Sequence, residues 1–147
     1  MVPNNYYNEY RRNQISTSSQ GKLILMMYDG AIQFAGMAAK ALDADDLPKK
    51  GKYIQKTHDI INELSCSLDV KKGGEVAVKL ENLYQFILNQ LILANIKSDR
   101  KALDSTIRIL VVLREAWETI INKTAHSAGS PASQPGAPAP QSITAKC

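Results

Sequence analysis

The chain has few of the residues that carry catalysis or bind metals. Among its 147 residues, two are histidine and two are cysteine. His58 falls at the margin of an expected helix and His126 near the end of the chain, and no Glu-x-x-His, Cys-x-x-Cys or His-Glu-x-x-His pattern accompanies them. The stretch "KKGGE" is too short for a phosphate-binding loop and lacks its Ser or Thr. We therefore expect no enzyme, with no catalytic residues, no cofactor and no metal site.

Long apolar runs are also absent. No stretch of about 18 apolar residues is present, so we expect no membrane insertion. The first residues, "MVPNNYYNEYRRNQ", lack the apolar centre of a secretory signal. We expect no disulfide between Cys66, in an expected helix, and Cys147, the last residue. Together these absences predict a cytosolic protein.

The charge balance is basic, with 18 Lys and Arg against 14 Asp and Glu and a net charge of +4. A basic chain can bind nucleic acid or acidic surfaces. Here the basic residues are scattered, and most fall at expected helix ends or in loops, where solvation explains them. We expect no nucleic-acid partner, and a helical regulator that binds nucleic acid or acidic partners by charge is kept as an alternative.

Helical periodicity is strong and strand signals are nearly absent, which predicts an all-α fold. The expected helices are residues 20–42, 48–69, 75–96 and a fourth that ends near residue 123. Pro48 suits a first helical turn, Gly73-Gly74 separates the second and third helices, and Ser98 or Asp99 can cap the fourth. Short connections predict an antiparallel four-helix bundle over residues 18–124.

Both ends of the chain differ from this bundle. Residues 1–17 contain Tyr6, Tyr7, Tyr10 and Ile15 and predict an N-terminal arm that docks on the bundle, because aromatic rings usually find a packing partner. Residues 125–147 are rich in Pro, Ala, Ser and Gly. This composition predicts a disordered C-terminal tail, because it buries too little apolar surface to offset the entropy of ordering.

The first helix has more apolar surface than a bundle core uses. Its "LILMMY" stretch, residues 23–28, reaches round the helix, and the clearly polar positions cover a band only about 60° wide. The third and fourth helices also carry apolar side chains outside their core stripes. The surplus predicts a docking groove for another chain, and the methionines favour this because a flexible thioether adapts to varied partners. Cover by the arm or a homodimer contact would explain the same surplus.

Several spaced motifs resemble the FliS family of flagellin-specific export chaperones. They are "TSSQGKLILMMYDGAIQF", "HDIINELSCSLDVKKGGEVAVKLENLY", "ILANIKSD" and "LREAW", and the likeness spans about Tyr10 to Trp117. Gln20 stands where the family often has proline, and "MMYDG" replaces the more usual "MLYDG".

The resemblance implies a four-helix bundle in the cytosol that holds the C-terminal segment of flagellin, a segment that is disordered before assembly. It implies that the chaperone prevents premature polymerisation and passes the loaded client to the export gate protein FlhA. It also implies that the arm, through Tyr10 and Ile15, covers the groove when no client is bound. The alternative is a helical-bundle regulator or adaptor that binds another partner through the same apolar surface.

Helical wheels, rather than the family motifs, assign most of the expected flagellin-binding residues. The wheel positions outside the core stripes are Leu25, Met26, Ile32, Phe86, Leu93, Ile109 and Val112. We add Met27 and Tyr28, which belong to the matched motif and are also compatible with a place in the core.

Overall fold

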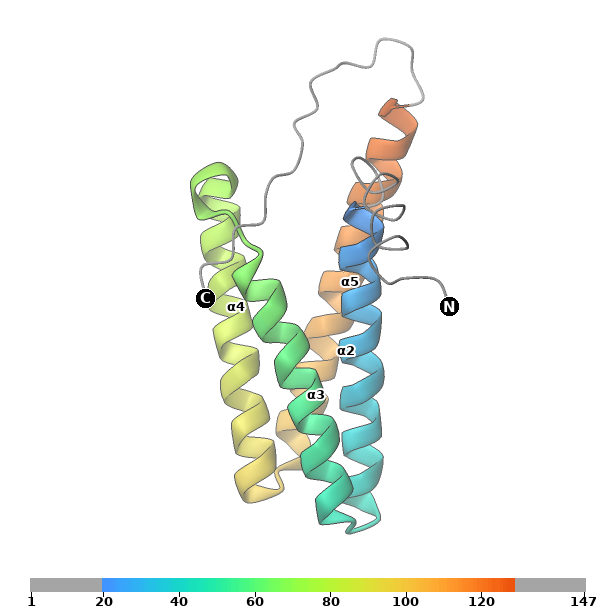
Figure 1. Cartoon of the computed structure of the whole chain (residues 1–147), viewed down its shortest axis with the longest axis vertical. Coiled ribbons are helices and arrows are strands. Elements are labelled where there is room, and N and C mark those ends of the chain that lie inside the picture. Colours follow the sequence, from blue (N-terminus) through green and yellow to red (C-terminus); the bar gives the residue numbers. More distant parts are fainter. Residues whose placement is uncertain (1–19, 129–147) are drawn as a thin grey trace, which may run out of the picture.

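The computed structural model describes residues 20–128, which form four helices. The helices are α2 (Gln20–Asp43), α3 (Leu47–Cys66), α4 (Val70–Lys97) and α5 (Arg100–Ala128). They run alternately up and down, and each packs along two neighbours, so that the described chain is an antiparallel four-helix bundle (Figure 1). The predicted all-α fold class is confirmed. The predicted arm and residues 129–147 of the predicted tail lie outside the described residues.

Helix α3 begins and ends close to the predicted positions. The Asp46 carboxylate caps its N-terminus by accepting the backbone N–H of Lys49 at 3.2 Å, and Pro48 occupies the first turn. The helix ends at Cys66, three residues before the predicted end at Asp69. Cys66 is disulfide-bonded, contrary to our expectation, and Cys147 lies outside the described residues.

Helix α4 begins at Val70, five residues before the predicted start at Glu75, because Asp69 caps an additional turn. The double glycine interrupts the helix rather than preceding it. Gly74 has φ 56° and ψ −134°, a conformation that other residues rarely adopt. A Cβ on Gly73 would lie 2.6 Å from a side-chain carbon one turn further on. Both positions therefore require glycine, and the regular helix resumes at Glu75 as predicted.

Helix α5 begins at the predicted place and extends further than predicted. The Asp99 carboxylate accepts the backbone N–H of Ala102 at 3.3 Å, whereas Ser98 ends α4 with φ 49° and ψ 46°. The helix continues to Ala128, beyond the predicted start of the tail at residue 125. No glycine or proline occurs between Arg100 and Gly129, so nothing in the sequence stops the helix at residue 125.

The core lies along the bundle axis between the four helices. The largest fully buried apolar side chains are Ile61, Leu64, Ile87, Leu91, Leu103 and Leu110. Helix α2 contributes mainly alanines to this core, including Ala31, Ala35 and Ala38. Small side chains let a helix approach its neighbours closely, and the larger residues of the other helices fill the interior.

Polar contacts tie the bundle at the end where α2 turns into α3 and α4 turns into α5, which we call the closed end. Lys50 of α3, only 5% exposed, donates to the carbonyl oxygen of Asn95 at 3.0 Å and to the hydroxyl of Ser98 at 3.1 Å. Arg100 at the start of α5 pairs with Asp43 at the end of α2. All four helices are thus linked at this end (the lower end in Figure 1).

Candidate functional site

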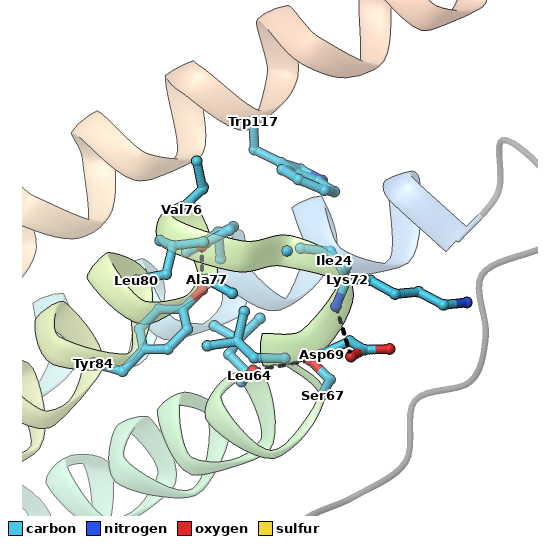
Figure 2. Close-up of a pocket in the computed structure, with 13 residues that line it drawn as sticks. Ile24, Leu64, Ser67, Asp69, Lys72, Val76, Ala77, Leu80, Tyr84 and Trp117 are labelled. Carbon is cyan, nitrogen blue, oxygen red and sulfur yellow. Dashed lines mark hydrogen bonds between the residues drawn. The ribbon is translucent and has the colours of Figure 1, made fainter. Parts of the chain in front are cut away.

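A cavity of about 370 Å³ opens between the helices at the end opposite the closed end (Figure 2). All four helices contribute to its wall, with Ile24 on α2, Leu64 on α3, Leu80 on α4 and Trp117 on α5. We call this space the end cavity. Its lining is largely apolar, which suits the insertion of apolar side chains from a partner.

Two pairs of helices form the sides of the end cavity. The indole N–H of Trp117 donates to the carbonyl oxygen of Gly21 at 2.9 Å, which links α5 to α2. The hydroxyl of Ser65 donates to the Glu81 carboxylate at 2.7 Å, which links α3 to α4. Across the opening, the Trp117 side chain points from α5 towards the side of the cavity that α3 and α4 form (Figure 2).

Two buried tyrosines join the pairs and line the cavity. The hydroxyls of Tyr28 on α2 and Tyr84 on α4 lie 2.5 Å apart, with the side chains 3% and 2% exposed. Burial is the main cause that raises the pKa of both hydroxyls above the usual value near 10, and the neighbouring Tyr28 raises the pKa of Tyr84 further. Both phenols are therefore protonated at neutral pH, and the hydrogen bond between them links α2 to α4.

A second apolar surface runs between α4 and α5, and we call it the α4/α5 seam. A cavity of about 280 Å³ there is lined by Leu83, Arg108, Ile109, Val112 and Leu113. Phe86 lies three residues after Leu83, and Leu93 follows seven residues after Phe86, so both lie along the same flank of α4. The exposed fractions are 46% for Phe86, 38% for Leu93 and 65% for Val112, which leaves much apolar area open.

The structure brings together four of the predicted flagellin-binding residues. Ile109 and Val112 line the seam cavity, and their positions on the helix place Phe86 and Leu93 on the adjoining flank of α4.

The five predicted residues on α2 are not part of that seam, because α2 packs along α3 and α5. Met26 is 61% exposed, whereas Leu25, Met27 and Ile32 are half-buried. Tyr28 is in the core, where a partner reaches it only through the end cavity. Tyr10 and Ile15, the predicted cover, lie outside the described residues.

The helical wheels did not reveal the end cavity. They correctly placed Tyr84 and Trp117 inward, but a wheel describes the cross-section of a helix and not the separation of helix ends. Two features of the sequence could have indicated the end cavity. One is the Gly73-Gly74 break, which lies beside the opening, and the other is Trp117, whose indole N–H needs an acceptor.

The chemistry available at both surfaces is that of protein–protein contact. Among the side chains that the structure describes, those of residues 20–123, no three His, Cys, Asp or Glu come together as ligands for a metal ion. None of the helices in that range combines the length and the apolar character that crossing a bilayer requires. What the surfaces offer is apolar area, bordered by a few charged groups.

Comparison with known proteins assigns a family to this arrangement. The family model described as "Flagellar protein FliS" matches residues 3–124. The chain is 31% identical to the flagellar secretion chaperone FliS of Bacillus subtilis over 88% of this chain and 98% of the relative. It is 35% identical to the FliS of Campylobacter jejuni over 83% of this chain and 95% of the relative. The chain therefore belongs to the FliS family of flagellar secretion chaperones, which are not enzymes.

Proposed function

We propose that this export chaperone binds the disordered C-terminal segment of flagellin in the cytosol, prevents its premature polymerisation and delivers it to the export gate protein FlhA. The observation that carries the proposal is the apolar surface that the bundle leaves uncovered. Phe86 and Val112 remain exposed along α4 and α5, and the end cavity is open at the end of the bundle opposite the closed end. A monomer that served only as a scaffold would gain nothing from this exposure.

Binding follows from the physics of a segment that folds on its partner. An amphipathic helix can lay one apolar face along a groove, with anchors spaced three, four and seven residues apart. Each large apolar side chain that becomes buried contributes about 1.5–3 kcal/mol. Ordering the client costs part of this gain, so the complex is firm but reversible. A chaperone that hands over its client needs this balance.

The client surface in this proposal has two parts. The first part is the α4/α5 seam, with Ile109 and Val112 and the neighbouring Phe86 and Leu93. On α2, Leu25, Met26, Met27 and Ile32 extend the contact around the bundle, and Tyr28 is reached through the end cavity.

A titration with the purified C-terminal segment of flagellin tests the proposal. Calorimetry should report one segment per chaperone, and circular dichroism should show a gain in helix content on mixing. Apolar docking should change little with salt. Absence of binding by a folded chaperone would contradict the proposal, and binding that weakens steeply with salt would instead support a partner held by charge, such as nucleic acid.

Deletion of residues 1–15 is expected to tighten flagellin binding. The preceding chain joins α2 at Gln20, one turn before Ile24 in the wall of the end cavity, so an arm carrying Tyr10 and Ile15 starts beside the opening. If the arm covers the groove nine-tenths of the time, its removal lowers the apparent Kd about tenfold.

Calorimetry on the full chain and the truncated chain measures this effect. A chain that lacks only residues 1–5, and so keeps Tyr10 and Ile15, is the control and should bind as the full chain does. Unchanged or weaker binding by the arm deletion, with the helix content intact, would count against a cover.

A further inference from the structure

Basic side chains border the half of the α4/α5 seam that lies nearer the closed end. Arg108 lines the seam cavity, and Lys101, seven residues earlier, lies on nearly the same face of α5. Lys97, eleven residues after Phe86, lies on the same flank of α4, since eleven residues make almost three full turns. All three basic residues are exposed. They border the apolar seam on the side towards the closed end.

These three positive charges have no described carboxylate partner. The ion pairs among the described residues involve Arg100 and Arg114 instead, and Arg108 makes only a 3.5 Å hydrogen bond, to the hydroxyl of Ser105 on its own helix. The nearest acidic residue on α5 is Asp104, one turn before Arg108, and its carboxylate pairs with Arg100. Glu115 follows two turns after Arg108, towards the open end. The half of the seam towards the open end thus has charges of both signs, because the same flank of α4 carries Lys79 there, five full turns before Lys97. Net positive charge is therefore concentrated in the half of the seam near the closed end.

We propose that this half of the seam binds an amphipathic helix that carries carboxylates along its flanks. The apolar face of the helix packs on Phe86, Leu93 and Ile109, and its acidic side chains face Lys97, Lys101 and Arg108. The inference rests on the proposed function for the use of the seam as a docking surface, and it adds the charge of the occupant. Complementary charge at the rim of a groove sets the register and the rate of association.

A second copy of this chain is a poor occupant of the same surface. Self-association through a two-fold interface brings identical patches together, so the three cations of each copy would meet those of the other. Repulsion between like charges then opposes the contact, whereas a helix with glutamates on its flanks relieves it.

Two synthetic helices with the same apolar face test the inference, one with glutamate and the other with glutamine along its flanks. Fluorescence anisotropy with the full chain at low salt should show about tenfold tighter binding of the glutamate helix, because a tenfold preference is 1.4 kcal/mol and three rim ion pairs can supply it. High salt should reduce the preference. The double variant Lys101→Glu/Arg108→Glu should abolish it.

A matched double variant controls for net charge. Lys40→Glu/Lys49→Glu changes two exposed lysines on the α2–α3 side and should keep the preference. Equal affinities for the two helices, no binding of either, or a preference that survives Lys101→Glu/Arg108→Glu would overturn the inference.

Titration of the flagellin segment into the same proteins separates this inference from the proposed function. If flagellin binds and the glutamate helix shows no preference, only the charge inference fails. If the glutamate helix is preferred and flagellin does not bind, the charge inference stands and the client assignment fails.

Discussion

Replacing Phe86 with alanine is expected to weaken binding of the flagellin segment by about three- to tenfold. Full burial of such a side chain contributes about 1.5–3 kcal/mol, and the ring, 46% exposed in the free chain, gains about half of this in the proposed complex. Each 1.4 kcal/mol changes the dissociation constant tenfold. Because Phe86 is already 46% exposed in the free chain, the substitution should affect the stability of the bundle much less than it affects binding.

Ile92→Ala is the matched control for this prediction. Ile92 lies on the same helix and is 47% exposed, nearly the same fraction as Phe86, but it lies on the flank of α4 away from the seam. Calorimetry on both variants should therefore show a loss of affinity for Phe86→Ala only. Equal losses would point to unspecific apolar attraction, and no loss in either variant would leave the end cavity as the client surface.

The free energy of unfolding is expected to fall steeply above about pH 10, the ordinary pKa of tyrosine. Tyr28 and Tyr84 have raised pKa values in the folded chain, because burial disfavours their charged form. In the unfolded chain both hydroxyls ionise near pH 10, so the folded state then binds more protons. The stability from this pair is complete below pH 10 and is lost as the pH rises, at about 1.4 kcal/mol per pH unit for each tyrosine.

Urea unfolding at roughly pH 9 and pH 11, on either side of the ordinary tyrosine pKa, measures the loss. The double variant Tyr28→Phe/Tyr84→Phe removes both hydroxyls together, so it leaves neither one buried without its partner. Lysines and the other tyrosines titrate in both proteins, and the difference between them isolates the pair. A double variant that loses stability as steeply as the parent would contradict the prediction.

Much of the fold could be predicted because its determinants are local. Periodic apolar residues identified all four helices, and Pro48 and Asp99 marked two helix starts close to their actual places. The errors occurred where two local rules competed. Asp69 was predicted to end α3 but caps the first turn of α4, and the double glycine was predicted to separate two helices but bends one. The sequence of a short segment does not show whether a residue at the boundary between two helices ends the first helix or caps the second.

The candidate site was predictable in part for a related reason. Phe86 and Leu93 lie seven residues apart, which places them on one flank of a helix whatever the surrounding fold. Their pairing with Ile109 and Val112 of α5 needs the packing of two helices, and the wheels supplied the faces but not the contact. Tyr28 could not be assigned from its helical-wheel position and the matched motif, because both are compatible with a place in the core and with a place on the surface.

The closed end and the end cavity have a consequence for how such a chaperone can diverge. The contacts of Lys50 and Arg100 that secure the fold lie at one end of the long axis, and the residues that line the end cavity lie at the other. Substitutions at distant sites usually act independently on stability. Selection can therefore vary the cavity residues to suit a changing cargo while the anchoring contacts keep the scaffold intact.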